Sequence, residues 1–253
     1  MPRYALRLEF DGAGFVGWQR QGDLPSIQKI IEEAAAPLNQ GVPPTATAAG
    51  RTDAGVHAAA MVADLWLAAD LAPERVRDAI SIRTLPHPIV VTAAARVAED
   101  WSARFACHER RYRYTILNRA GRPALAARRA WHIKRELDAG AMHRAAQTLL
   151  GRHDFSAFRA ASCQAASALR TLDQLDVARI GETIVITTRA RSFLHHQVRN
   201  LVGTLVEIGA GRRPEDWAAE LLAGRDRTRA GQTAPPDGLV FEGAAYDPEP
   251  SWT

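Results

Sequence analysis

The sequence predicts an α+β fold built from two mixed α/β halves, residues 1–105 and 106–253. The chain has 253 residues, 47% of them hydrophobic, and single hydrophobic cores commonly stop growing near this length. Segments with apolar residues at every second position alternate with segments of helical apolar spacing. The same succession of patterns begins again at Arg110. We therefore expect two packed cores.

The first half opens with a strand and then a helix. Tyr4–Phe10 alternates apolar and other residues, which is typical of a half-buried strand. The sequence of Asp11–Gly14 is typical of a turn or flexible loop. Ser26 is a suitable N-cap for a helix whose apolar residues recur at helical spacing as far as Leu38.

Four further segments complete this half. Gly50–Gly55 predicts a structured loop, because glycines permit backbone conformations closed to other residues. A strand over 58–67, a short helix from Pro73 to Ile80 and a strand over 89–92 follow it.

The second half again combines predicted strands and helices. Strands are predicted over 112–117 and 184–187, and Asp138 caps a helix that reaches Leu149. Two more helices are indicated by apolar spacing and terminal glycines, one from about Val198 to Gly209 and one from Pro214 to Leu222 ahead of Gly224.

Composition limits the class of protein. The N-terminal segment has no signal-peptide pattern, and no apolar stretch reaches a membrane-spanning length. Only Cys107 and Cys163 are present, far apart, so we expect neither a disulfide framework nor a thiolate zinc site, and we expect a cytoplasmic location. The net charge of +4 is small, and the preference for arginine fits either phosphate binding or genomic base composition.

Asp53 is the first candidate for chemistry. It follows Arg51 in the glycine-flanked loop, where nearby guanidinium charge keeps a carboxylate ionised and suited to act as a nucleophile or base. An aspartate that hydrogen-bonds its own turn, beside a solvated arginine, has the same pattern. Spacing alone leaves both interpretations open.

The string Gly50–His57 is very similar to the signature of the TruA family of tRNA pseudouridine synthases, in which the aspartate is the essential catalytic residue. Further blocks resemble that family in the proper order along the chain. They are Asp11–Gly12 with Phe15–Gln19, Phe105 with Arg110–Tyr114, Gly151–Phe158, Phe193–Asn200 with Val202–Gly203, and Ala234–Pro235 with Gly238–Leu239.

The resemblance implies a fold, an activity and partners. It implies the pseudouridine synthase fold, with two ferredoxin-like halves, a mixed and mostly antiparallel sheet, and a central RNA-binding cleft. It implies an isomerase that modifies uridines 38 to 40 in the anticodon stem-loop of tRNA, recognised through shape and backbone. It also implies a homodimer that shares one tRNA and uses no metal or cofactor.

Tyr112 is the predicted stacking residue. The strand Arg111–Tyr114 places its two tyrosines on one face and its two arginines on the other. An aromatic ring can stack on an extruded base while guanidinium groups hold phosphates, although an ordinary strand has the same alternation. The resemblance puts the family's active-site tyrosine, which stacks on the target base and takes part in proton transfer, at Tyr112.

Arg199 stands beside the apolar stripe of its predicted helix, where a charged side chain either needs a carboxylate partner or reaches out to solvent. The resemblance pairs it with Asp53. That pairing leaves Arg51 for the RNA phosphates or for positioning the base. Arg110 is expected to contact substrate, and Leu239 matches a family residue that lines the pocket, although a core leucine would look the same.

Two other classes of protein are alternatives to a tRNA pseudouridine synthase. A catalytically silent tRNA-binding or tRNA-folding protein could keep the fold, but Asp53, Tyr112 and Arg199 are all present. A metal-dependent nuclease lacks a convincing ligand set, because His195 and His196 are adjacent and diverge on a helix.

The chemistry requires breaking the N-glycosidic bond, rotating the uracil and rejoining it to the ribose through C5. One carboxylate, one base and a pocket that retains the uracil suffice. Attack at C1′, attack at C6 and removal of a 2′ proton remain open. Ile82, Pro88 and Gln197 depart from the family pattern and concern substrate-loop contacts more than catalysis.

Overall fold

The computed structural model describes all residues from Met1 to Thr253 and divides them into two compact units. Unit 1 comprises residues 1–110 and 240–253, and unit 2 comprises residues 111–239. The break thus falls at Arg110 rather than at 105, and unit 1 is discontinuous. Its last segment belongs there because β10 (Leu239–Ala245) pairs in parallel with β3 (His57–Trp66), and because Thr253 exchanges backbone hydrogen bonds of 3.0 and 3.2 Å with Ala94.

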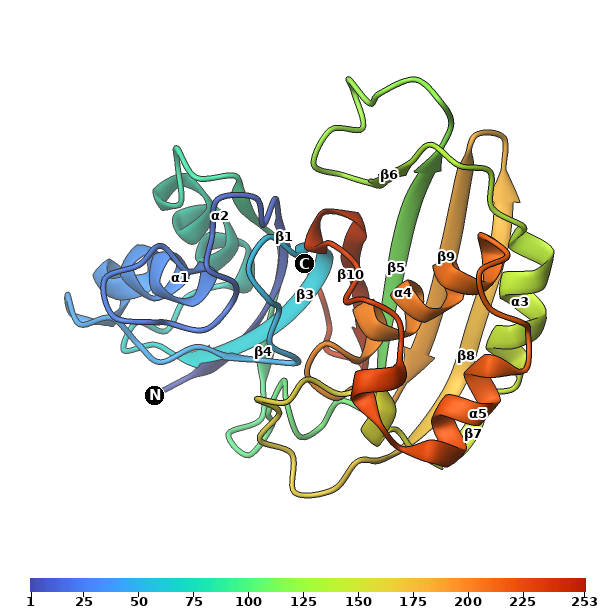
Figure 1. Ribbon diagram of the computed structural model, residues 1–253. Coiled ribbons are helices and arrows are strands. Elements are labelled where there is room, and N and C mark those ends of the chain that lie inside the picture. Colours follow the sequence, from blue (N-terminus) through green and yellow to red (C-terminus); the bar gives the residue numbers. More distant parts are fainter. The chain divides into compact units, whose positions relative to one another are not determined.

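The sheet of unit 1 has the strand order β4–β1–β3–β10. Strand β1 is antiparallel to both β3 and β4, and the short β2 also pairs with β3. Helix α2 packs against β4, and α1 contacts α2 (Figure 1). The bounds are β1 Arg3–Phe10, α1 Ile27–Ala35, a 3₁₀ turn η1 Ala36–Asn39, β2 Thr47–Ala48, α2 Pro73–Arg83 and β4 Ile89–Val97.

The predicted strands and helices of this half are present, although α1 ends at Ala35, α2 and β4 run further than predicted, and β2 and β10 were not predicted. The Ser26 hydroxyl accepts a hydrogen bond from the Lys29 amide at 3.4 Å, which is the expected N-cap of α1. Strand β4 runs beyond the predicted 89–92 because the alanines at 93–95 pair with β1 and are buried. Alanine has little strand preference of its own, so the tertiary pairing decides.

Unit 2 contains strands in the order β5–β9–β8–β7, with β6 parallel to β5. Helix α3 packs on β8 and contacts α4 (Figure 1). The bounds are β5 Glu109–Asn118, which enters unit 2 at Arg111, β6 Trp131–Ile133, α3 Ala139–Gln147, β7 Gly151–Asp154, η2 Ser156–Phe158, β8 Leu169–Ile180, β9 Thr183–Ala190, α4 Gln197–Gly209, α5 Trp217–Gly224, η3 Arg227–Arg229 and η4 Pro236–Gly238.

The protein is therefore a mixed α+β structure with mostly antiparallel strands, as predicted. Several elements of unit 2 differ from expectation. Strands β6, β7 and β8 were not predicted, and charged and polar residues interrupt the apolar positions of β8. Helix α5 begins at Trp217 rather than Pro214, since the Trp217 amide donates to the Pro214 carbonyl at 3.2 Å in a turn that precedes the helix.

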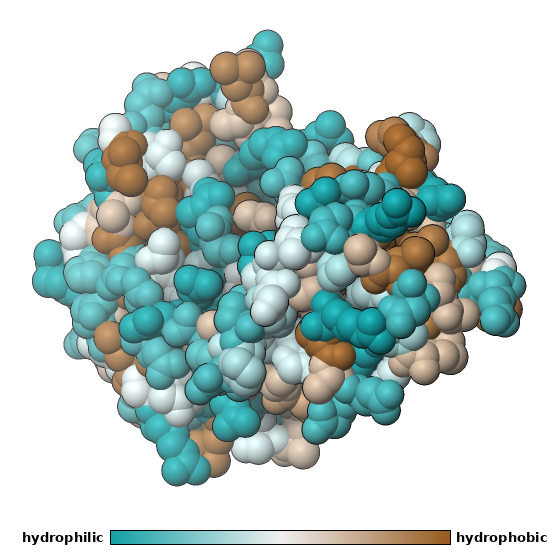
Figure 2. Space-filling view, turned by 180° about the vertical axis from the view of Figure 1, so that it is seen from behind, coloured by the Kyte–Doolittle hydropathy of each residue, from teal (hydrophilic) through white to brown (hydrophobic).

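Each unit buries its own apolar core. In unit 1, fully buried residues include Leu6 and Leu8 of β1, Ile31 of α1 and Ile80 of α2; in unit 2 they include Ile116 and Leu205. On the face seen in Figure 2, hydrophobic residues occur as separate small groups among hydrophilic ones. No helix has both the length and the apolar character to cross a bilayer.

Candidate active site

The loop that carries Asp53 is held by backbone hydrogen bonds to a second loop of unit 1. The Trp18 amide donates to the Thr52 carbonyl at 3.0 Å, and the Gly55 amide donates to the Phe15 carbonyl at 3.3 Å. A turn closes the loop where the Val56 amide donates to the Asp53 carbonyl at 3.2 Å. Asp53 is half-buried in this arrangement, between β2 and β3. Hydrogen bonds at Thr52, Asp53 and Gly55 therefore fix the backbone at and on both sides of Asp53.

Two glycines allow the loops to approach this closely. A side-chain carbon added at Gly12 would lie 1.9 Å from the Val56 carbonyl oxygen. Gly17 has φ of +102°, and a carbon added there would lie 2.5 Å from the Thr52 carbonyl oxygen and 2.9 Å from the Asp53 carbonyl carbon. Non-bonded atoms do not approach so closely. Only glycine fits at these positions.

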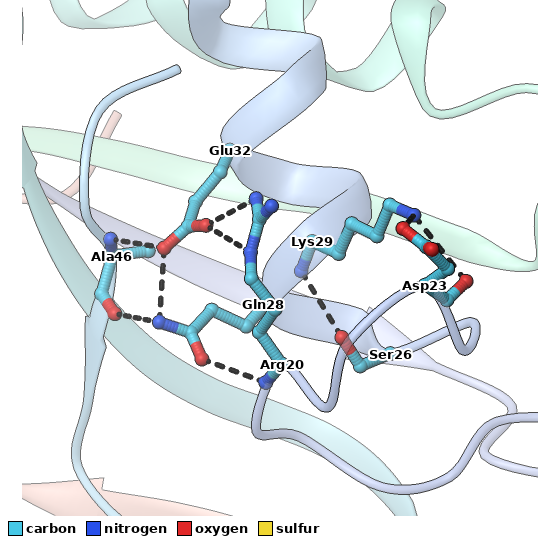
Figure 3. A network of polar contacts seen from close by, with 7 residues as sticks. All are labelled: Arg20, Asp23, Ser26, Gln28, Lys29, Glu32 and Ala46. Carbon is cyan, nitrogen blue, oxygen red and sulfur yellow. Dashed lines mark hydrogen bonds and ion pairs between the residues drawn. The ribbon is translucent and has the colours of Figure 1, made fainter.

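The buried carboxylate of Glu32 on α1 binds two chain segments, one at Arg20 and one at Ala46 (Figure 3). Glu32 Oε2 accepts from Nε and Nη2 of Arg20 at 3.2 and 2.7 Å, and Oε1 accepts from the Ala46 amide at 2.9 Å. Gln28 joins the network, because its Nε2 donates to Glu32 Oε1 at 2.9 Å and its Oε1 accepts from the Arg20 amide at 3.0 Å. Arg20 follows the Trp18 segment and Ala46 precedes β2, so Glu32 ties together the two chain segments that frame Asp53.

Replacing Glu32 by alanine is expected to lower the free energy of unfolding by about 2–4 kcal/mol. The reason is that the buried Ala46 amide and the Arg20 guanidinium lose their acceptor, while the Gln28 amide group keeps only the Ala46 carbonyl at 3.2 Å. Chemical unfolding followed by tryptophan fluorescence measures the change. Glu33→Ala is the matched control, because Glu33 is the next residue of α1 and is exposed. Equal losses in the two variants would contradict the anchoring role.

Arg110 is only 8% exposed, and its guanidinium donates to three carbonyl oxygens of unit 1. Its Nε donates to Ala49 at 2.8 Å, its Nη1 to Cys107 at 3.4 Å and its Nη2 to Arg104 at 2.8 Å. Ala49 immediately precedes the Gly50 loop. These contacts give Arg110 a structural role in positioning backbone, and the predicted contact with substrate stays a prediction.

In unit 2, Tyr112 lies on β5 with its ring against that of Phe193. The ring centroids are 5.2 Å apart and the planes meet at 89°, an edge-to-face geometry. Tyr112 is partly exposed, whereas Tyr114 is fully buried and donates its hydroxyl to the Pro235 carbonyl at 2.8 Å. Burial raises the pKa of Tyr114, which therefore stays a neutral donor. The sequence patterns did not assign Phe193 a role, although it begins one of the family blocks.

Arg199 lies near the beginning of α4, where it is partly exposed and bound to Ala234. Its Nε donates to the Ala234 carbonyl at 2.7 Å, and the Ala234 amide donates to the Arg199 carbonyl at 3.1 Å. This contact requires a close approach, because a side-chain carbon at Gly203 would lie 1.7 Å from the Gln232 carbonyl oxygen. The segment before β10 is thus fixed against α4, and Leu239 is buried where β10 begins.

The predicted site residues fall into two sets, one in each unit. Asp53, Arg51 and Arg110 belong to unit 1, where Arg51 is exposed in the loop beside Asp53. Tyr112, Arg199 and Leu239 belong to unit 2. Sequence reasoning missed the residues that hold the first set, above all Glu32 and Gly17. Glu32 lies in a helix whose other buried residues are apolar, which is the one local signal of a buried, partnered carboxylate.

Comparison with known proteins covers both units. A family model described as tRNA pseudouridine synthase matches residues 145–247. A tRNA pseudouridine synthase A of Acidiphilium cryptum (strain JF-5) is 57% identical over 251 residues, which cover 99% of the chain and 98% of the relative. Proteins of the same name from Methylobacterium sp. (strain 4-46) and Gluconobacter oxydans (strain 621H) are 54% and 51% identical; 99% of the chain is covered in each case, with 99% and 92% of the relative.

Proposed function

The chain belongs to the tRNA pseudouridine synthase A family, and on this premise we propose that it converts uridine to pseudouridine in tRNA. The observation that carries the proposal is the identity of 51–57% to proteins of that name over nearly the whole chain, which includes the Gly50–His57 loop. The chain is thereby an isomerase that acts on RNA. The geometry around Asp53 supports this role, because a backbone fixed by two loops presents a partly exposed carboxylate.

The chemistry balances without an external reagent. The bond from C1′ to N1 of the uridine breaks, a bond from C1′ to C5 forms, the C5 proton leaves and N1 gains a proton. We assign the nucleophile to Asp53, whose carboxylate attacks C1′ or C6 or removes a 2′ proton. Tyr112 stacks on the extruded uracil and takes part in proton transfer, and Arg199 is the ion-pair partner of Asp53. Arg51 contacts phosphate or positions the base.

The edge-to-face contact with Phe193 supports the stacking role of Tyr112, because it fixes the orientation of the Tyr112 ring before RNA arrives. The hydrogen bond to Ala234 supports the role of Arg199 in the same way, because it restrains the guanidinium on one side. Leu239 lines the uracil pocket and Arg110 contacts the substrate. These assignments follow the family pattern residue by residue.

Several finer features follow from family membership alone and form part of the proposal. The substrates are uridines 38 to 40 of the anticodon stem-loop, and the uracil must leave its helix before any side chain can reach C1′. The two units are ferredoxin-like, with the RNA bound in a central cleft. The enzyme acts as a homodimer without a metal or cofactor. Mass measurement in solution is expected to give twice the mass of 27.6 kDa, and a monomer at working concentration would exclude the dimer.

The test is release of tritium from tRNA labelled at C5 of uridine, since that hydrogen leaves in the reaction. We expect release by the wild type that persists when a chelator is added, and sequencing of the product is expected to place pseudouridine at positions 38 to 40. A transcript in which these positions are cytidine is the control and should release nothing above background. Failure of the wild type to release tritium from any tRNA would favour the catalytically silent tRNA-binding protein.

A further inference from the structure

Phe105 is a large aromatic residue that the fold presents to solvent. Its side chain is 77% exposed, on a turn of unit 1 just before β5. Isolated exposed hydrophobic residues are common and need no explanation by themselves. Two properties separate Phe105 from the others: the turn around it is held by buried polar groups, and a guanidinium lies over its ring.

The first side of the turn is fixed at Ala103. The Ala103 amide donates to Asp64 Oδ1 at 2.7 Å, and the Asp64 carboxylate is 2% exposed in strand β3. The Ala103 carbonyl accepts from the Tyr246 hydroxyl at 2.8 Å. Both partners are buried side chains, so the backbone on this side of Phe105 is restrained by the core of unit 1.

The second side is fixed by Arg110, whose Nη2 donates to the Arg104 carbonyl at 2.8 Å. The same guanidinium donates through Nε to the Ala49 carbonyl, one residue before the Gly50 loop. One rigid, planar group therefore holds both the turn of Phe105 and the chain that leads to Asp53. The position of the exposed ring is thus fixed with respect to the catalytic loop within the same unit.

The surroundings of the ring suit a nucleic acid. The guanidinium carbon of Arg104 lies 5.4 Å from the Phe105 ring centroid, within the range of a cation–π contact. An aromatic face beside a cation matches the alternation of base and phosphate in single-stranded RNA. Because the turn is fixed before RNA arrives, stacking on it costs little ordering entropy.

We propose that Phe105 is a stacking platform for an unpaired base of the RNA substrate near the reacting uridine, with Arg104 as a phosphate contact beside it. The inference rests on the proposed function and adds a binding position to it. Arg104 lies over one face of the ring, so the base stacks on the opposite face. Stacking of this kind tolerates any base, because each base has a π-face. The contact therefore contributes affinity without restricting sequence.

The experiment measures the dissociation constant of tRNA in an Asp53→Asn background, so that binding is separated from turnover. Phe105→Ala is expected to raise the dissociation constant roughly 5- to 100-fold, the range that base–aromatic stacking supports. Phe105→Trp restores an aromatic face and is expected to bind within a few-fold of the parent. Leu125→Ala is the matched control, because Leu125 is a fully exposed hydrophobic residue of unit 2 that has no aromatic ring, and it should leave binding unchanged.

The salt dependence of tRNA binding distinguishes the contribution of the Arg104 guanidinium from that of the Phe105 ring. Arg104→Ala is expected to reduce the slope of log Kd against log salt by about 0.7–0.9, the contribution of one phosphate contact, whereas Phe105→Ala leaves the slope unchanged. Unaltered tRNA binding by a folded Phe105→Ala variant would overturn the proposal, as would a change in its oligomeric mass, which would assign the ring to a contact between subunits. If the wild type releases no tritium from tRNA, the proposed function and this inference fall together.

Discussion

Asp53→Asn is expected to reduce tritium release from labelled tRNA by about 10⁴-fold or more. The amide has nearly the shape of the carboxylate but cannot act as a nucleophile or accept a proton, and loss of a covalent catalyst typically costs this much. The half-buried setting of the residue favours survival of the fold, because an amide fits the same space. Release is measured under single-turnover conditions with excess enzyme, so that weak binding does not imitate lost chemistry.

Asp23→Asn is the control for this substitution, because Asp23 is a fully exposed carboxylate in the loop that precedes α1. It is expected to release tritium at the wild-type rate. Thermal unfolding and tRNA binding of Asp53→Asn should match the wild type within error. Undiminished release by the variant would remove Asp53 from the role of nucleophile while leaving family membership intact.

Gly17→Ala is expected to lower the single-turnover rate by about 100-fold. The added carbon would meet the Thr52 carbonyl oxygen at 2.5 Å, so the Asp53 backbone must move, and displacements of about 1 Å at a reacting group cost this much. The substitution also forces a side chain into a left-handed conformation, which costs about 1–2 kcal/mol. Rate and unfolding midpoint are measured on the same preparation.

Gly14→Ala separates the two causes. Gly14 has φ of +103°, nearly that of Gly17, yet an added carbon there meets nothing within 4 Å. Backbone strain alone therefore lowers the stability of Gly14→Ala while its rate stays within about threefold of the wild type. Equal loss of rate in the two variants would show that strain in the loop, rather than displacement of Asp53, controls the chemistry.

The order of strands and helices could be predicted where local pattern and tertiary environment agree. Strand β1 has large apolar residues at every second position, Tyr4 to Phe10, and all four are buried, and Ser26 caps α1 as its residue type suggests. Strand β8 shows no such alternation, since its charged residues lie among the apolar ones and its pairing with β9 supplies the missing information. The return of β10 to unit 1 depends on contacts between residues nearly two hundred positions apart, which no local pattern records.

In the candidate site, too, local sequence predicted some features, and others depend on tertiary contacts. The structured loop around Asp53 followed from its glycines, whereas the roles of Asp53, Tyr112 and Arg199 came from the family resemblance and stay predictions. The direction in which a guanidinium points could not be predicted from sequence, so the hydrogen bonds from Arg110 to three backbone carbonyls were not foreseen, and its contact with substrate stays a prediction. Glu32 carried no chemical signature at all, because its importance comes from the three partners that the fold brings to it.

The discontinuity of unit 1 has a consequence for biosynthesis. Residues 240–253 complete the sheet next to β3, but the ribosome makes them only after all of unit 2. Unit 2, being continuous from 111 to 239, can therefore reach its final structure while unit 1 still lacks β10. The start of β3, directly after the Asp53 loop, pairs with β1 first and gains β10 as its second neighbour last. A nascent chain of this enzyme would thus become competent for modification only after residues 240–253 have been made.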